Sequence, residues 1–379
     1  MTDNNENKVL NVPHLRFPEF SGEWETKSIN DLADVIGGGT PDTTVKSYWD
    51  GGIQWFTPSE IGKNKFVDAS LRTITEDGLN NSSAKLLPPN TILLSSRATI
   101  GECSLSLREC ATNQGFQSLV SKNCNVDFLY YLIQTKKKDL IRKSCGSTFL
   151  EISANEVRKI QVSVPSDVEQ QKIAELLSLI DKRIATQNKI IEKLQSLIKG
   201  IAQHCIKEST SGNTYVKLGD ICQITTGKLD ANAQVDNGIY PFFTCAEQPF
   251  KIDSFAFDTE ALLISGNGAN LGYINYYKGK FNAYQRTYVL DLFSENIQYI
   301  KWALKVLLPK RIAIEKSSSN TPYIVLSTLT DLRLPIPCKS KQSFIANLMQ
   351  SLERKLSNQI AQYDSYNYLK QYLLRQMFI

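Results

Sequence analysis

The chain has 379 residues, of which 42% are hydrophobic and 21% charged, and its formal net charge is +5. This is ordinary globular composition with apolar material for more than one core, which argues against a largely disordered or fibrous chain. Eight cysteines without a Cys-x-x-Cys pair and only two histidines indicate neither a zinc site nor a disulfide framework. The opening MTDNNENKVL has no apolar core for a signal peptide, and no apolar run approaches the length of a membrane span, so we predict a soluble, cytoplasmic protein without a metal site.

Residues 25–165 are predicted to form a globular part that mixes strands and helix. Short apolar and β-branched runs, separated by Gly, Pro and Asn, indicate strands, for example at 91–96 and 160–165. One helix is expected over 128–143, and it ends in a run of basic residues. The elements lack the regular strand–helix alternation of a dinucleotide-binding domain.

A long helix is predicted over 166–208 and a second one over 338–379, because apolar residues recur there at alternating steps of three and four. The first seam comprises Ile173, Leu177, Ile180, Ile184, Gln187, Ile191, Leu194, Ile198 and Ile201. The second comprises Ile345, Met349, Leu352, Leu356, Gln359, Tyr363, Tyr366 and Leu373. This heptad register is typical of a coiled coil. The alternative is an amphipathic helix packed on a globular domain, whose apolar stripe drifts from a strict 3.5-residue repeat.

The second half of the chain repeats the first. Residues 160–165 (IQVSVP) match 332–337 (LRLPIP), and the same offset continues into both long helices. Upstream, SSRATIG at 95–101 matches GNGANLG, and the stretch from residue 29 resembles the one from residue 218. These offsets place an insertion between residues 40 and 90 of the first copy. A unit of this length, present twice, indicates a duplicated module rather than a solenoid.

We therefore predict an α/β (α+β) fold with a pseudo-two-fold internal repeat. Two similar globular domains and two long helices are expected to alternate, over 1–165 (with a tail at 1–20), 166–208, 209–337 and 338–379. The symmetry of the repeat favours antiparallel pairing of the helices, with Ile173 opposite Met377 and Gln187 opposite Tyr363. This arrangement puts the globular domains at opposite ends of the helix pair.

The order domain–helix–domain–helix with these motifs resembles the specificity (S) subunit of type I restriction–modification enzymes. The resemblance covers essentially the whole chain and is carried by three stretches: VPHLRFPEFSGEW at 12–24, ILLSSRATIG with a downstream TNQGF at 92–116, and VSVPSDVEQQKIAELLSLID at 162–181. It implies that each globular domain is a target recognition domain for one half of a bipartite double-stranded DNA site. The helices are then expected to set the spacer and to dock two methyltransferase (M) subunits.

The same resemblance implies that the chemistry lies on other chains. S-adenosylmethionine is expected on the M subunits, with no cofactor on this chain, and restriction (R) subunits complete the complex. In agreement, the sequence contains neither a [DN]PP[YF] adenine-methylation motif nor a phosphate-binding G-x-x-x-x-G-K-[ST] loop. The alternatives are a coiled-coil scaffold with two protein-binding ends and a fused DNA-modifying enzyme without recognisable motifs.

Candidate DNA contacts recur at the end of the predicted helix in each copy. Basic residues are followed there by a polar loop, which suits phosphate contacts and base-edge hydrogen bonds. The first copy offers Lys136, Lys137, Lys138, Arg142, Lys143, Ser147 and Thr148, and the second Lys310, Arg311, Lys316, Ser319 and Asn320. A solvated helix face with its C-terminal cap explains the same residues without DNA.

Three further candidates belong to the first copy alone. Arg97 lies in SSRATIG and suits a bidentate guanine contact, although an exposed turn arginine is the alternative. Lys63 and Lys65 lie in the insertion beside Trp49 and Trp55. The tryptophans suit either DNA contact or core packing. Because only the first copy has this insertion, we expect it to contribute sequence specificity.

Overall fold

The computed structural model describes residues 10–146, 150–209, 214–316 and 323–379. The chain divides into two compact units, Met1–Asn188 with Gln362–Ile379, and Lys189–Ala361. Each unit therefore contains one globular domain and a part of each long helix, α6 (Asp167–Glu208) and α9 (Lys339–Gln376). The two units are described in turn.

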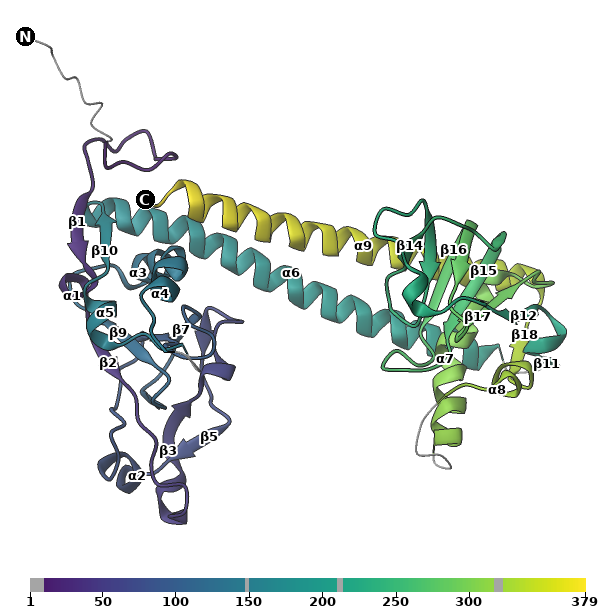
Figure 1. Ribbon diagram of the computed structural model, residues 1–379, viewed down its shortest axis with the longest axis horizontal. Helices are drawn as coiled ribbons and strands as arrows, with labels where there is room; N and C mark the ends of the chain where they lie inside the picture. Colours follow the sequence, from purple (N-terminus) through teal and green to yellow (C-terminus); the bar gives the residue numbers. More distant parts are fainter. Residues whose placement is uncertain (1–9, 147–149, 210–213, 317–322) are drawn as a thin grey trace, which may run out of the picture. The chain divides into compact units, whose positions relative to one another are not determined.

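The first unit holds three sheets. A five-stranded sheet has the order β2-β9-β6-β7-β4, a three-stranded sheet has the order β5-β3-β8, and β1 pairs with β10. Figure 1 shows β1 beside β10 near the start of α6. The strands are β1 (Glu25–Ser28), β2 (Ala33–Gly37), β3 (Trp49–Phe56), β4 (Phe66–Val67), β5 (Arg72–Ile74), β6 (Ile92–Leu94), β7 (Cys103–Ser106), β8 (Cys110–Thr112), β9 (Gln117–Ser121) and β10 (Gln161–Val164). The helices are α1 (Ile29–Leu32), η1 (Lys46–Tyr48), η2 (Pro58–Glu60), α2 (Glu76–Asn80), α3 (Val126–Thr135), α4 (Lys137–Arg142) and α5 (Ala154–Arg158).

The helix expected over 128–143 is two helices, α3 and α4, and this part of the prediction was wrong. Lys136 separates them with a φ of −90° and a ψ of 8°, and its N–H donates to the carbonyl of Ile133. This i to i−3 bond replaces the i to i−4 bond of a continuous helix. After the break, the α4 side chain of Leu140 is fully buried in the same core as α3.

The second unit repeats this plan with a larger sheet. Its six strands have the order β12-β17-β15-β16-β13-β14, and β11 pairs separately with β18. The strands are β11 (Thr214–Lys217), β12 (Gln223–Thr226), β13 (Tyr240–Phe243), β14 (Phe250–Ile252), β15 (Phe257–Ser265), β16 (Ile274–Ala283), β17 (Thr287–Asp291) and β18 (Arg333–Ile336). The helices are η3 (Leu218–Asp220), η4 (Ala231–Ala233), α7 (Ile297–Lys316) and α8 (Leu326–Thr330).

The internal repeat is visible in the strand pairing and in one close backbone contact. The first and last strands of each domain pair antiparallel, with Glu25 opposite Val164 in one copy and Thr214 opposite Ile336 in the other. A Cβ at Gly38 would lie 1.9 Å from the Asn113 carbonyl oxygen, and a Cβ at Gly227 would lie 1.9 Å from that of Ala283. Only glycine fits these positions, because the chain just after β2 or β12 passes directly against the main chain, at Asn113 in the loop before β9 or at Ala283, the last residue of β16.

Helices α6 and α9 pair, and contacts within each unit make the pairing antiparallel. In the first unit, Lys370 of α9 forms an ion pair of 2.7 Å with Asp181 of α6. In the second unit, the Lys341 ammonium donates to the carbonyl oxygen of Glu208 at 3.1 Å. Residues early in α9 thus meet residues late in α6, and the reverse. The predicted fold class, two α/β domains joined by a pair of antiparallel helices, is confirmed.

Seam residues enter the cores of both units. In the first unit, Ile173, Leu177, Ile180 and Leu373 are buried and Ile184 is partly buried, and in the second unit Leu194, Ile198, Ile345 and Met349 are buried while Ile201, Leu352 and Leu356 are partly buried. Near the middle of the helices Gln187 and Ile191 are buried, whereas Gln359, Tyr363 and Tyr366 are half-buried. On α9 the seam residues near the middle of the helix are therefore less buried than Ile345, Met349 and Leu373, which pack into the globular cores.

Candidate nucleic-acid interface

The basic run of the first unit borders a cavity of about 640 Å³ between α3, α4 and the end of α9. The Lys136 ammonium points inward and donates to the main-chain oxygen of Ile379 at 2.6 Å, and its burial lowers the pKa of this lysine. Lys137 forms an ion pair of 2.5 Å with Glu102. Lys138 is exposed and forms no ion pair within the described residues. Of these three lysines, Lys138 is therefore the one most available to an anionic partner.

Arg142 and Lys143 end the same helical segment. Arg142 is 77% exposed and pairs with Asp139 at 2.7 Å, while Lys143 lies 4.0 Å from a carboxylate oxygen of Glu156. Exposed ion pairs contribute little to stability, so a phosphate can replace these carboxylates at low cost. Ser147 and Thr148, expected in the following loop, lie outside the described residues.

The corresponding segment of the second unit is the end of α7. The helix continues through Pro309 to Lys316. Lys310 is exposed, and the half-buried Arg311 forms an ion pair of 2.8 Å with Glu315 one turn later. The Lys316 side chain, Ser319 and Asn320 lie outside the described part of the chain. The exposed cation that the structure places here is Lys310.

Arg97 lies in a turn with unusual backbone geometry. Its guanidinium forms an ion pair of 2.8 Å with Glu151, and its side chain is 43% exposed. The next residue, Ala98, has a φ of 56°, which is rare for a residue other than glycine. Such strain at an exposed turn is common at functional sites. The arginine is accessible, but a base contact must displace Glu151.

The tryptophans of the insertion belong to the core. Trp49 and Trp55 are 7% and 4% exposed, and their rings pack edge to face with centroids 5.2 Å apart. The Trp55 indole N–H donates to the carbonyl oxygen of Gly39 at 2.9 Å. Core packing, the alternative to DNA contact, therefore describes both residues. Lys63, in the loop before β4, is exposed.

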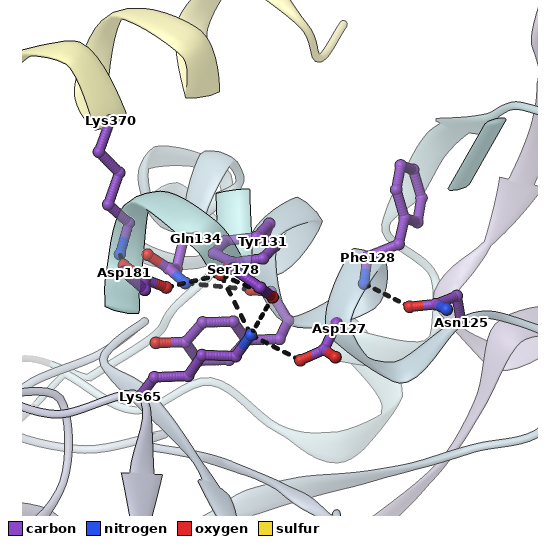
Figure 2. Close-up of polar contacts among 10 residues, drawn as sticks. Lys65, Asn125, Asp127, Phe128, Tyr131, Gln134, Ser178, Asp181 and Lys370 are labelled. Carbon is purple, nitrogen blue, oxygen red and sulfur yellow. Dashed lines mark hydrogen bonds and ion pairs between the residues drawn. The ribbon is translucent and has the colours of Figure 1, made fainter. Parts of the chain in front are cut away.

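Lys65 is the centre of a polar network that the sequence did not predict. The side chain is 8% exposed, and its ammonium lies 2.6 Å from a carboxylate oxygen of Asp127. It also donates to the Tyr131 hydroxyl at 3.1 Å and to the Ser178 hydroxyl at 2.7 Å (Figure 2). The structure thus places this lysine inside the domain, with its charge satisfied by the protein itself.

The same network continues into the paired helices. The Tyr131 hydroxyl donates to Asp181 of α6 at 2.6 Å, and Asp181 pairs with Lys370 of α9 (Figure 2). Burial and the neighbouring Asp181 carboxylate raise the pKa of Tyr131, so the hydroxyl keeps its proton and acts as a donor. We refer to Lys65, Asp127, Tyr131, Ser178, Asp181 and Lys370 as the Lys65 junction.

The second unit has a simpler contact at the equivalent position of its helix. Glu353 of α9 lies one repeat length after Asp181. It pairs with two lysines of α7, Lys301 at 2.8 Å and Lys305 at 3.3 Å. Burial lowers the pKa of Lys305, and the Glu353 carboxylate opposes that shift. Asp181 and Glu353 at matching repeat positions are a sequence signal for the helix side of both contacts, but their lysine partners come from different elements and do not follow from it.

The N-terminal motif of the first unit is held by a buried carboxylate. Both oxygens of Glu169 accept from the Arg16 guanidinium at 2.8 Å, and the Trp24 indole N–H donates to one of them at 3.4 Å. The Glu169 side chain is 2% exposed. This bidentate pair raises the pKa of Arg16 and joins the start of the domain to the start of α6.

The described residues contain neither a cluster of metal ligands nor a candidate membrane span. No group of three or more His, Cys, Asp or Glu side chains among them is placed to hold a metal ion. Within the same ranges, no helix has the length and apolarity needed to cross a membrane.

Comparison with known proteins gives consistent matches along the chain. The family model described as "Type I restriction modification DNA specificity domain" matches it twice, over residues 21–196 and 210–363. The specificity subunit of the type I restriction enzyme MjaIX from Methanocaldococcus jannaschii is 30% identical over 381 residues, which cover 89% of this chain and 88% of that protein. The EcoprrI specificity subunit of Escherichia coli is 25% identical over 365 residues, or 90% of each chain.

A solved structure shares the fold. The crystal structure of the S subunit of a type I restriction–modification system from M. genitalium superposes with a TM-score of 0.65. The match covers 97% of this chain and 99% of that one, at 18% sequence identity. The likeness in fold therefore extends over both globular domains and both long helices.

Proposed function

Because the chain belongs to the type I restriction–modification DNA specificity family, we propose that each of its two globular domains reads one half of a bipartite double-stranded DNA site. The chain is a DNA specificity subunit, which is the non-catalytic part of a type I enzyme. The observation that carries the proposal is the double match of the family model, once around each globular domain. Two related but non-identical readers suit two half-sites separated by a spacer that neither contacts.

The helix pair is proposed to set the spacer. In this scheme residues 1–165 and 209–337 are the target recognition domains, and the helices over 166–208 and 338–379 hold them apart. The helices also dock two M subunits, which carry S-adenosylmethionine, and R subunits complete a cytoplasmic complex. The antiparallel contacts of α6 with α9 support this scheme, because within each unit they join the start of one long helix to the end of the other.

Exposed cations are proposed as the phosphate contacts. Lys138, Arg142 and Lys143 serve the first domain and Lys310 the second, while Lys63 contributes from the insertion. Arg97 is proposed to read a guanine edge after it leaves Glu151. Their exposure and their weak ion pairs support this assignment.

The test is single-molecule methylome sequencing of a host that expresses this chain together with its M partner. We expect one bipartite motif, with methylated adenine in both halves and a single spacer length. The control is the same host with the M partner alone, which should show no such motif. Methylation without a preferred motif, or one continuous motif without a spacer, would contradict the proposal. That result would instead favour the scaffold alternative.

A further inference from the structure

The Lys65 junction lies where the first recognition domain meets the two long helices. Its members come from the loop before β4, from α3, from α6 and from α9. The two lysines and two aspartates balance in charge. One continuous chain of contacts therefore links the domain to both helices.

We expect the Lys65 junction to fix the position of the domain against α6 more than to raise the free energy of unfolding. Moving charges out of water costs much of what their attraction returns, so a buried ion pair is weak evidence for stability and is often replaceable by apolar groups. Its partners must, however, meet at fixed distances and angles, unlike an apolar contact, which can slide. Lys65 contacts Asp127, Tyr131 and Ser178 at once, so its ammonium defines a single position of the insertion against α6.

The insertion makes this contact specific to the first domain. Lys65 lies in the stretch that the second copy lacks, and its counterpart contact uses Lys301 and Lys305 of α7 with Glu353. Asp181 and Glu353 nevertheless occupy the same position of the repeat. Each globular domain therefore contacts a long helix at the same repeat position, and the lysines that take part come from different elements.

We propose that Lys65 is a positioning residue that fixes the orientation of the first recognition domain on α6 and thereby the spacer length that the protein accepts. This rests on the proposed function, in which the domains read two half-sites across a spacer. Base pairs are ~3.4 Å apart along DNA, so a shift of the domain by that distance changes the accepted spacer by one base pair. Half-site recognition is proposed to rest on Arg97 and the exposed cations, which are not partners of Lys65, and it is therefore not altered.

The experiment measures methylation by the complex of this chain with its M partner. The substrates are duplexes that carry the same two half-sites and spacers of the preferred length, one base pair shorter and one longer. For Lys65→Met we expect the preference for the correct spacer to fall at least about fivefold, with unchanged discrimination against a half-site mismatch. Ser178→Ala, which removes the hydrogen bonds of this hydroxyl with Lys65 and Tyr131 and leaves both charges of the Lys65–Asp127 pair in place, should produce a smaller change in the same direction.

A matched control removes a lysine from a surface ion pair of the same domain. Lys122 pairs with Asp34 at 3.0 Å on the exposed side of β2 and β9, and Lys122→Met should keep the wild-type spacer ratio. An equal loss of methylation on all three spacers would overturn the inference, because a merely structural lysine lowers activity without changing the ratio. An unchanged ratio in both variants, beside a sharp wild-type preference, would also overturn it and leave the proposed function intact. A wild type without any spacer preference would overturn both.

Discussion

Each half of the chain has a glutamine at the same repeat position, where the globular domain meets the long helix that follows it. In the first half, Gln170 accepts from the backbone N–H of Asn125 at 3.0 Å and donates to the carbonyl oxygen of Pro165 at 3.0 Å. In the second half, Gln342 makes the same two bonds, with Asn296 at 3.0 Å and Pro337 at 2.9 Å. Both glutamines are buried. The same pair of hydrogen bonds therefore connects the globular domain to its long helix in both halves, and we refer to each pair as a joint.

One residue earlier in each helix, the halves differ completely. Glu169 is buried and binds Arg16 of the N-terminal segment, whereas its repeat counterpart, Lys341, is half-buried and donates to the end of α6. The main-chain plan is therefore common to both halves, while the ionic contacts around it are particular to each. This division suits a protein whose two domains share one architecture and read different sequences.

The largest loss of stability is expected at the Arg16–Glu169 contact, where the two halves differ most. Arg16→Leu leaves the Glu169 carboxylate buried without its bidentate partner, so we expect the free energy of unfolding of the first unit to fall by about 3–5 kcal/mol. Urea unfolding followed by tryptophan fluorescence measures it. The matched change in the other half, Lys341→Leu, should cost less than ~1 kcal/mol. Equal losses for the two variants would show that the ionic contacts are not particular to each half.

A smaller and symmetrical effect is expected at the shared joint. Gln170→Leu and Gln342→Leu each leave a buried backbone N–H and a buried carbonyl without partners, at a cost of about 2 kcal/mol. Both glutamines make further bonds, since Gln170 donates to Asp167 at 3.2 Å and Gln342 donates to Glu295 at 2.6 Å, so the two variants should differ by less than ~1 kcal/mol. Thermal unfolding of the two variants checks this equality. A large loss in one half and none in the other would break the equivalence of the two joints.

The features that the sequence predicts are those set by local pattern. The heptads predict both long helices and their pairing, because a strict 3.5-residue repeat needs a partner helix. The break at Lys136 is not predictable, since lysine favours helix and the break comes with contacts from distant parts of the chain. The Lys65 junction is not predictable from local sequence either, because the hydrogen-bond partners of Lys65, Tyr131 and Ser178, lie 66 and 113 residues away in the chain. The sequence shows where lysines and arginines cluster, but whether a given side chain faces solvent depends on the tertiary fold.

The smallest expected effect concerns two aspartates that secure the start of each globular domain. Ser28 and Lys217 occupy equivalent positions of the repeat. The Ser28 hydroxyl and backbone N–H donate to Asp31 and hold the pKa of that carboxyl below its ordinary value of 3.8. Lys217 does the same for Asp331 through an exposed ion pair of 2.8 Å. Both aspartates therefore stabilise the fold above about pH 4 and lose that contribution as the pH falls through their lowered pKa values.

High salt should distinguish the Lys217–Asp331 ion pair from the hydrogen bonds of Ser28 with Asp31. Mobile ions screen an exposed ion pair but leave a neutral hydroxyl and an N–H bonded to a carboxylate largely unaffected. Raising the salt concentration to 1 M should move the pKa of Asp331 upward toward 3.8, while the pKa of Asp31 changes less. Carboxyl carbon NMR titration resolves the two groups, and Lys217→Met should reproduce the upward shift at low salt. Parallel shifts of both aspartates with salt would mean that long-range charge, rather than these local contacts, holds their pKa values down.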